Sequence, residues 1–408
     1  MTIQDEVREL PVRRDIRKFR EARLPLRELH GTPEPLVKFR YPNGIVGWLV
    51  TRAEDFKAIL GDGRFHAKRF LGEPQPTPVS VAVPDMPGFI PSMNGAEHLR
   101  VRRLAAGDFS VKRVNELRPF FLEVVDKHLD DVVAHGSPAD LYSLYALPIP
   151  SEVIAGILGV PETHTEDFQN AARLTIGGRS EALQDVDAPA RAIRRLHEIV
   201  GEVIELKREH PSDDLITRLI QADPPLTDTE IKGLCTNLLL AGHETTATGS
   251  AVSIAILLER PDQLAEFRAN PGRLPDAVEE LNRFRTMLAD AGSGIPRLCT
   301  EDVEYKGQLI RKGDWVMLST GLANFDPASC PVDPTTFDIR RDRPPSNLTF
   351  GFGAHTCLGQ HLARAEMQII LSRVFERFPD LQLVEPLDQM PWMDKGFGYR
   401  MAELMVTF

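Results

Sequence analysis

One long apolar stretch constrains the fold of this chain more than any other feature. Thr227 and Glu230 have the spacing of a capping box, and the stretch that follows them continues to Glu259, just before an Arg-Pro pair. About 32 helical residues at 1.5 Å each span roughly 48 Å, which is enough to cross an entire domain. The sequence therefore predicts one central helix around which the rest of the chain packs.

The composition of this helix would also suit a membrane span, but its charges argue against one. His243 and Glu244 lie near its middle, where a bilayer penalises charge most. Neither a positively charged flank nor an aromatic belt accompanies it. We therefore expect a helix buried inside a protein that does not associate with membranes.

The remaining pattern predicts a mainly α protein with minor β-sheet. Helical periodicity dominates after residue 115, while alternating strands and turn residues predict two strand pairs, at 37–50 and 303–316. Six prolines within 74–91 predict a long loop. Since no linker, repeat or low-complexity block divides the chain, we expect residues 1–408 to form a single domain.

Charge and cysteine content exclude several classes of protein. The chain has 48 Lys and Arg against 59 Asp and Glu, a net charge of −11, so a nucleic-acid binder is not expected. Four cysteines are too few for a disulfide framework, and no pair has Cys-x-x-Cys spacing. With acidic residues where a signal peptide would be apolar, we expect a cytoplasmic protein.

The segment Phe350–Gly359 carries the strongest chemical signal, because its glycines surround Cys357 just before a helical pattern that starts at Gln360. Glycines allow tight bends that bring amide N–H groups near the sulfur, and a helix N-terminus adds partial positive charge. Both effects favour the thiolate over the thiol. This chemistry suits either a catalytic nucleophile, with His355 as its base, or a metal ligand.

The pattern Phe-x-x-Gly-x-x-x-Cys-x-Gly resembles the heme-ligand loop of the cytochrome P-450 superfamily, and three further motifs occur in that family's order. The resemblance covers roughly residues 94–408. It implies a helix-rich fold with small sheets and a heme b cofactor whose iron takes Cys357 as its axial thiolate ligand. It assigns cofactor contacts in this loop to Phe350, Gly351, His355, Cys357 and Gly359.

Glu280-Leu-Asn-Arg283 resembles the Glu-x-x-Arg motif of the same family. On its own this spacing is typical of any surface ion pair on a helix. The resemblance implies instead that Glu280 and Arg283 form a buried ion network with a later arginine. That arginine is expected to be Arg341, with Arg340 and Arg343 as alternatives.

The middle of the long helix, Ala241-Gly242-His-Glu244-Thr245-Thr, resembles the family's oxygen-activation segment. Small residues at Ala241 and Gly242 would let the helix pass close over a flat cofactor. The acid Glu244 and the hydroxyl of Thr245 would relay protons to the reacting oxygen. These two residues are the expected catalytic pair.

Four basic residues match the positions at which the family binds the heme propionates. His98 and Arg102 are four residues apart, so on a helix they share one face. Arg297 and His355 occupy the other two positions. Buried carboxylates need such partners, because an unpaired one costs several kcal/mol.

The chain must receive electrons from a separate protein, since it has no flavin or dinucleotide fingerprint. The resemblance implies a ferredoxin and a ferredoxin reductase as donors. Residues 98–118 contain six Lys and Arg residues against two acidic residues. This stretch is therefore basic although the whole chain is acidic. This stretch suits either a docking patch or a solvated helix face.

The resemblance specifies a cofactor and a reaction type but not the substrate. The run between Ala289 and Leu298 resembles the branch that couples aromatic rings of cyclodipeptides, although Asn347 replaces that family's usual histidine. We expect coupling or tailoring of an aromatic cyclodipeptide in secondary metabolism. The alternatives are hydroxylation or epoxidation of a polyketide, terpene or carrier-bound amino acid, and a non-catalytic ligand sensor. The expected pocket residues are Met93, Thr286, Leu288, Ile295 and Phe397.

Overall fold

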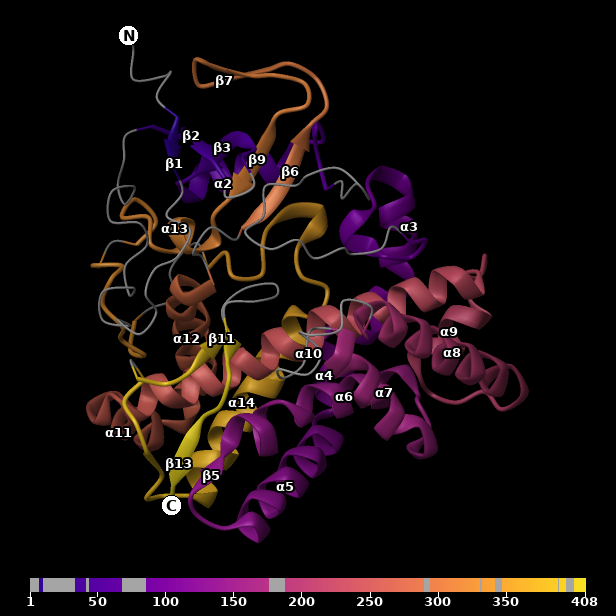
Figure 1. Ribbon diagram of the computed structural model, residues 1–408, viewed down its shortest axis with the longest axis vertical. Helices are drawn as coiled ribbons and strands as arrows, with labels where there is room; N and C mark the ends of the chain where they lie inside the picture. Colours follow the sequence, from indigo (N-terminus) through magenta and orange to yellow (C-terminus); the bar gives the residue numbers. More distant parts are fainter. Residues whose placement is uncertain are drawn as a thin grey trace. The chain divides into compact units, whose positions relative to one another are not determined.

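The computed structural model of this protein describes residues 7–9, 34–41, 44–67, 86–175, 188–289, 294–330, 332–341, 347–387, 389–393 and 400–408. These residues are mainly helical with small sheets, which confirms the predicted fold class (Figure 1). The chain forms two compact units. Unit 1 comprises Met1–Asp85, Ala265–Cys357 and Asp394–Tyr399, and unit 2 comprises Met86–Leu264, Leu358–Met393 and Arg400–Phe408.

Unit 1 contains a six-stranded mixed sheet. In spatial order its strands are β1 (Arg8–Glu9), β2 (Leu36–Arg40), β3 (Val46–Val50), β9 (Trp315–Leu318), β6 (Ile295–Cys299) and β4 (Phe65–His66). Strands β2 and β3 form the predicted antiparallel hairpin, and β3 runs parallel to β9. The second predicted pair is also present, as antiparallel β7 (Val303–Tyr305) and β8 (Gln308–Ile310).

Both faces of this sheet are buried, because alternate side chains of a strand point to opposite faces. Trp48 and Val50 of β3 pack on one face with Phe56. Leu49, between them in sequence, packs on the other face with Leu322. The helices and short helical turns of the unit are α2 (Ala53–Gly61), η6 (Pro271–Arg273), α12 (Leu274–Ala289), α13 (Thr320–Asn324) and η7 (Gly353–His355).

Unit 2 is built mostly from helices (Figure 1). Its helices are α3 (Gly95–Ala106), α4 (Val111–Glu116), α5 (Arg118–His135), α6 (Pro148–Leu158), α7 (Glu162–Thr175), α8 (Ala188–Glu209), α9 (Leu215–Gln221), α10 (Asp228–Leu258) and α14 (Gln360–Arg377). Helix α11 (Pro261–Ala269) spans the boundary with unit 1. The short helical turns are η3 (Ile90–Ser92), η4 (Gly107–Phe109) and η5 (Tyr142–Ala146). The strands are β5 (Ala139–Asp140), β10 (Gln382–Leu383), β11 (Trp392–Met393), β12 (Arg400–Met401) and β13 (Met405–Thr407).

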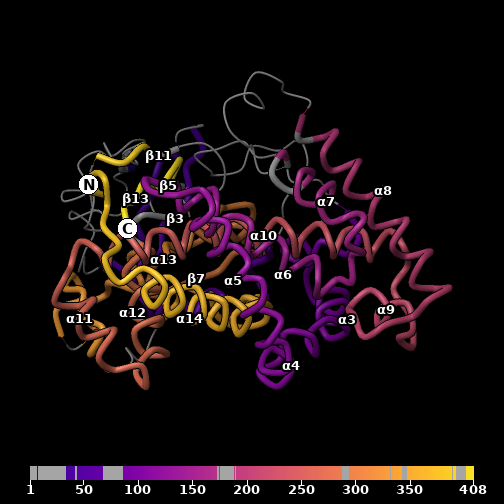
Figure 2. The backbone as a smooth tube through the Cα atoms, turned by 90° about the horizontal axis from the view of Figure 1, so that it is seen from below, coloured from indigo at the N-terminus to yellow at the C-terminus, as the bar shows by residue number. Residues whose placement is uncertain are grey.

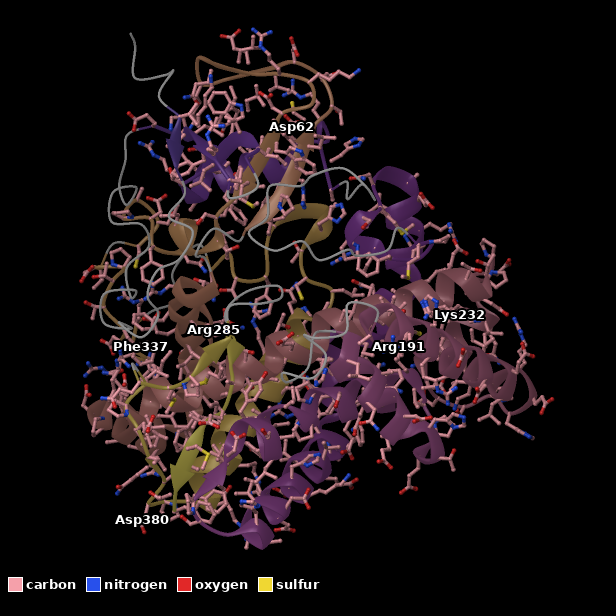
Figure 3. All side chains as sticks on the ribbon, viewed as in Figure 1. Asp62, Arg191, Lys232, Arg285, Phe337 and Asp380 are labelled. Atoms are coloured by element: carbon pink, nitrogen blue, oxygen red, sulfur yellow. The ribbon has the colours of Figure 1, made fainter. Side chains whose placement is uncertain are left out.

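The predicted central helix is α10, and its capping box is formed as expected. Thr227 Oγ1 accepts a hydrogen bond from the Glu230 N–H at 3.3 Å, and Glu230 Oε2 accepts one from the Thr227 N–H at 2.9 Å. Helices α6, α8 and α14 pack against α10 (Figure 2). Lys232 marks the N-terminal end of α10 in Figure 3. Across the described residues, no helix is long and apolar enough to span a bilayer.

Two glycines allow the segment before α3 to lie directly against α10. A Cβ on Gly233 would lie 2.0 Å from the Pro87 carbonyl oxygen, and a Cβ on Gly88 would lie 2.0 Å from the Glu230 carbonyl oxygen. Only glycine fits at such distances. Most of the predicted proline-rich loop, residues 74–85, lies outside the described residues.

Candidate functional site

The glycine-rich loop before Cys357 is closed by a backbone hydrogen bond. The Cys357 N–H donates to the Phe350 carbonyl at 2.8 Å. Gly351 and Gly353 have φ angles of 73° and 72°, in the left-handed region that favours glycine. A Cβ on Gly353 would also lie 3.2 Å from the Leu60 carbonyl oxygen. These contacts hold Cys357 at the end of a loop of defined shape.

Cys357 is the cysteine whose environment suits a thiolate ligand. It is exposed, whereas Cys235, Cys299 and Cys330 are buried. Burial raises the pKa of Cys235 to about 12 and raises the pKa of Cys299 above its ordinary value. Because the thiolate rather than the thiol binds metal, buried thiols of this kind are poor ligands. The donor set therefore fits a heme whose iron takes one accessible thiolate from the protein.

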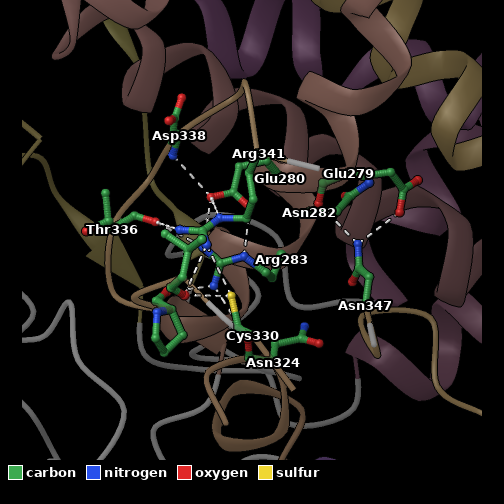
Figure 4. Close-up of polar contacts among 12 residues, drawn as sticks. Glu279, Glu280, Asn282, Arg283, Asn324, Cys330, Thr336, Asp338, Arg341 and Asn347 are labelled. Atoms are coloured by element: carbon green, nitrogen blue, oxygen red, sulfur yellow. Dashed lines mark hydrogen bonds and ion pairs between the residues drawn. The ribbon is translucent and has the colours of Figure 1, made fainter. Parts of the chain in front are cut away.

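Glu280 and Arg283 form a buried ion pair on α12 (Figure 4). Arg283 Nε donates to Glu280 Oε2 at 2.7 Å, and Arg283 Nη2 donates to Glu280 Oε1 at 2.8 Å. Arg283 Nη1 donates to the Pro334 carbonyl at 2.7 Å, and the guanidinium carbon lies 4.8 Å from the centre of the Phe325 ring. Removing one charge of such a pair is costly, because the other stays buried without compensation.

Arg341 is the arginine that joins this pair. Its Nε donates to Glu280 Oε1 at 3.4 Å, and its Nη2 donates to two carbonyls of the 332–341 segment at 2.9 and 2.8 Å (Figure 4). Arg340 instead pairs with a neighbouring aspartate, and Arg343 lies outside the described residues. The Glu280 carboxylate therefore ties the 332–341 segment to α12.

Asn324 connects α12 to the loop that leads to Cys357, a role that the sequence pattern did not reveal. Its Nδ2 donates to Thr286 Oγ1 at 3.3 Å and to Thr349 Oγ1 at 3.1 Å. Its Oδ1 accepts from the Leu348 N–H at 2.6 Å. A buried amide between two apolar neighbours is the signal that could have found it, because buried polar groups need partners.

Asn347 performs a similar function at the position where the sequence departs from the family pattern. Its Nδ2 donates to Glu279 Oε2 at 2.9 Å (Figure 4), and its Oδ1 accepts from Thr349 Oγ1 at 2.7 Å. An imidazole can also donate through one nitrogen and accept through the other. The asparagine therefore provides the donor and acceptor that a histidine would provide here.

The middle of α10 presents a polar stripe although most of the helix is buried. Ala241 and Thr245, one turn apart, are exposed, Glu244 is half-buried, and His243 is buried. Thr245 Oγ1 donates to the Ala241 carbonyl at 2.5 Å. Its lone pairs remain able to accept a hydrogen bond from another group. A Cβ on Gly242 would lie 3.3 Å from a side chain of α6.

The four predicted anion-binding residues divide equally between the two units. His98 is buried and Arg102 half-buried one turn later on α3, in unit 2. Arg297 is buried on β6, and His355 is half-buried at the end of η7, both in unit 1. His98 and Arg102 therefore lie one turn apart on the same helix, as their spacing predicts.

The predicted pocket residues are also distributed over both units. Met93 is buried in unit 2, Thr286 is buried and Ile295 is half-buried in unit 1. The Thr286 hydroxyl donates to the Arg283 carbonyl at 2.6 Å, so it is engaged within α12. Leu288 lies on α12, and Phe397 lies outside the described residues.

Part of the basic charge in residues 98–118 is neutralised within unit 2. Arg100 pairs with Glu230, and Arg113 Nη2 pairs with Asp213 Oδ2 at 2.8 Å. Arg103 and Lys112 are exposed. Any docking role for this stretch therefore depends on a few surface cations.

A family model described as Cytochrome P-450 matches residues 181–271 and 274–408 of the chain. Nocardicin C N-oxygenase of Nocardia uniformis subsp. tsuyamanensis is 41% identical over 378 residues, which cover 92% of this chain and 93% of the relative. Pentalenic acid synthase of Streptomyces avermitilis is 39% identical, covering 94% and 93%. Mycinamicin IV hydroxylase/epoxidase of Micromonospora griseorubida is 36% identical, covering 88% and 89%.

Solved structures agree over nearly the whole length. The crystal structure of CYP105P1 in complex with filipin I has a TM-score of 0.86 at 34% identity and covers 99% of each chain. MoxA from Nonomuraea recticatena has a TM-score of 0.85 at 37% identity, covering 95% of this chain and 96% of that one. The similarity therefore includes sequence as well as fold.

Proposed function

Because this chain belongs to the cytochrome P-450 family, whose members are oxidoreductases that hold heme b through a cysteine thiolate, we propose that Cys357 supplies that thiolate. The exposed Cys357 at the end of its closed loop is the observation that carries this assignment. When bound, the heme supplies dioxygen activation, and a thiolate ligand favours O–O cleavage. His355 then contributes to anion binding rather than acting as a base for Cys357.

The remaining residues bind and orient the cofactor. His98, Arg102, Arg297 and His355 offset the two propionate charges. Phe350, Gly351 and Gly359 shape the loop at Cys357, while Ala241 and Gly242 keep α10 free of bulky side chains next to the heme. Residues 1–408 act as one catalytic domain, which is supported by relatives that align with up to 94% of the chain.

Glu244 and Thr245 move the protons that the reaction consumes. Thr245 Oγ1 already donates to the Ala241 carbonyl, so its lone pairs accept a hydrogen bond from a bound water. Glu244, half-buried beside it, exchanges protons with solvent. This pair is the reason to favour an enzyme over a ligand sensor, because a sensor needs no proton delivery.

The experiment for this relay compares Thr245→Ala with Thr245→Ser. Both variants should keep the heme content of the wild type. Thr245→Ala should divert most reducing equivalents to hydrogen peroxide, measured as peroxide formed per electron donated, because no hydroxyl positions the water. Thr245→Ser keeps the hydroxyl and should remain coupled. Tight coupling in Thr245→Ala would contradict the relay.

The substrate is a small secondary metabolite, and an aromatic cyclodipeptide is our first candidate. The run between Ala289 and Leu298 supports it. A panel of cyclodipeptides containing Trp, Tyr or Phe should contain compounds that convert the heme from low to high spin. If none does, the second candidate is hydroxylation or epoxidation of a polyketide, terpene or carrier-bound amino acid, which the relative named mycinamicin IV hydroxylase/epoxidase supports.

Electrons come from a ferredoxin and its ferredoxin reductase in the cytoplasm. The exposed cations Arg103 and Lys112 lie in the locally basic stretch that would meet an acidic ferredoxin. None of the four cysteines forms a disulfide bond, which suits a reducing compartment.

A further inference from the structure

A second arginine of α12, Arg285, lies in unit 1 and is labelled in Figure 3. Its Nε and Nη2 both donate to a single atom, Asn282 Oδ1, at 3.0 and 2.9 Å. Among the described residues, no carboxylate lies within ion-pair distance of this guanidinium. Asn282 is itself fully buried, and its Nδ2 finds no hydrogen-bond acceptor in the described part of the chain.

Arg285 is surrounded by protein but is not sealed from small molecules. Desolvation lowers its pKa to about 10, so the guanidinium is still protonated at neutral pH. The residue is nevertheless half-buried rather than buried. Arg283, two residues earlier, is 0% exposed. Among the described residues Arg285 Nη1 has no hydrogen-bond partner, and this nitrogen is not sealed from solvent as Asn282 Nδ2 is, so a small molecule can reach it.

The unused N–H donors of Arg285 match one chemical group. A guanidinium has five N–H donors in a rigid fork, and Asn282 Oδ1 takes only two of them. Three N–H groups of Arg285, both on Nη1 and one on Nη2, therefore remain for a ligand, whereas Asn282 Nδ2 is sealed from solvent. A carboxylate accepts from such a fork through both oxygens, and charge-assisted bonds of this kind are among the strongest in proteins.

We propose that Arg285, held in place by Asn282, binds a carboxylate group of the substrate. The proposal rests on the proposed function, because Arg285 directly precedes Thr286, the first residue of the expected substrate-pocket stretch. The substrate is then a small metabolite whose acid group is distant from the atom that is oxidised. This narrows both candidate substrate classes to their acidic members.

The test measures spin-state titrations of the heme-loaded enzyme with arylalkanoic acids of increasing length, from phenylacetic to 6-phenylhexanoic acid, and with their primary amides. Acid and amide have nearly the same shape, so the ratio of their affinities measures the contribution of the negative charge to binding. The best acid should bind about 10- to 100-fold more tightly than its amide. If no acid in the series is preferred over its amide, the proposal is wrong.

Variants show whether Arg285 causes the preference. Arg285→Leu should bind acid and amide with similar affinity, and Arg285→Lys should keep part of the preference for the acid. Arg64→Leu, which removes an exposed arginine of the same unit, should behave as wild type. An unchanged acid preference in Arg285→Leu would overturn the proposal.

Arg285 could bind a heme propionate instead of a substrate carboxylate. The heme-to-protein ratio of the variant distinguishes these two roles. Arg285→Leu should retain the full heme content of the wild type. A drop in heme content with an intact acid preference would assign Arg285 to a propionate and overturn the substrate assignment. The thiolate-type Soret band of the wild type is recorded first, so a failure of the proposed function is recognised separately.

Discussion

Arg283 and Arg285 lie two residues apart on α12 but have opposite surroundings. Arg283 is fully buried and donates to both Glu280 oxygens and to the Pro334 carbonyl. Arg285 reaches only Asn282 among the described residues. A buried charge whose donors are all used stabilises the protein that surrounds it. A desolvated, half-buried charge with unused donors costs stability, and we attribute the presence of Arg285 to a ligand.

The largest expected effect comes from Glu280→Gln, which removes the anion shared by Arg283 and Arg341. Two buried guanidiniums would then lose their counter-ion and keep mainly backbone carbonyls as partners. The free energy of unfolding should fall by about 3–5 kcal/mol, measured by denaturant titration. Glu304→Gln, at an exposed position of the same unit, should change it by less than about 0.5 kcal/mol. Equal effects of the two substitutions would contradict the network's structural role.

Arg285→Leu should act in the opposite direction and more weakly. Replacing a poorly paired, half-buried cation by an apolar side chain is often neutral or stabilising, so the ligand-free enzyme should gain between 0 and about 2 kcal/mol. The readout is the midpoint of thermal unfolding, with Arg64→Leu as the reference. A loss of the size expected for Glu280→Gln would show that Arg285 is structural, and the contrast with Arg283 would disappear.

The smallest effect is expected from Asp338→Asn, at the surface end of the same segment. Its hydrogen bond with Arg340 holds the pKa of Asp338 below the ordinary value of 3.8. A lowered carboxyl pKa stabilises the fold above that ordinary value, and the contribution is lost as the pH falls through the folded-state pKa. The exposed pair should contribute less than about 1 kcal/mol at neutral pH and nothing at about pH 2. A difference in the free energy of unfolding between the wild type and Asp338→Asn that grows as the pH falls would contradict this role of Asp338.

Features that depend on neighbouring residues could be predicted from the sequence. The capping box of Thr227 and Glu230 and the hairpin of β2 and β3 are examples, because both ends of each contact are close in the chain. The pair Glu280 and Arg283 belongs to this class too. Its spacing alone predicts only a surface pair, and the family resemblance was needed to expect its burial.

Contacts between distant segments could not be predicted where the family resemblance names no partner. Asn324 bonds to Thr286, 38 positions away, and to Thr349, 25 positions away, and no local pattern specifies such partners. The role of Arg285 could not be predicted for a different reason. An arginine near the end of a helix is ordinarily a solvated residue, and only the folded chain shows that this one is desolvated.

The central claim, that Cys357 supplies the thiolate, is tested most directly by the absorption spectrum of the reduced, carbon monoxide-bound protein. The wild type and Cys235→Ala, which alters a buried thiol, should both show a thiolate-type Soret band. Cys357→Ala should lose that band, and Cys357→His should show the band of a nitrogen-ligated heme. A thiolate-type band that persists in either Cys357 variant would contradict the account.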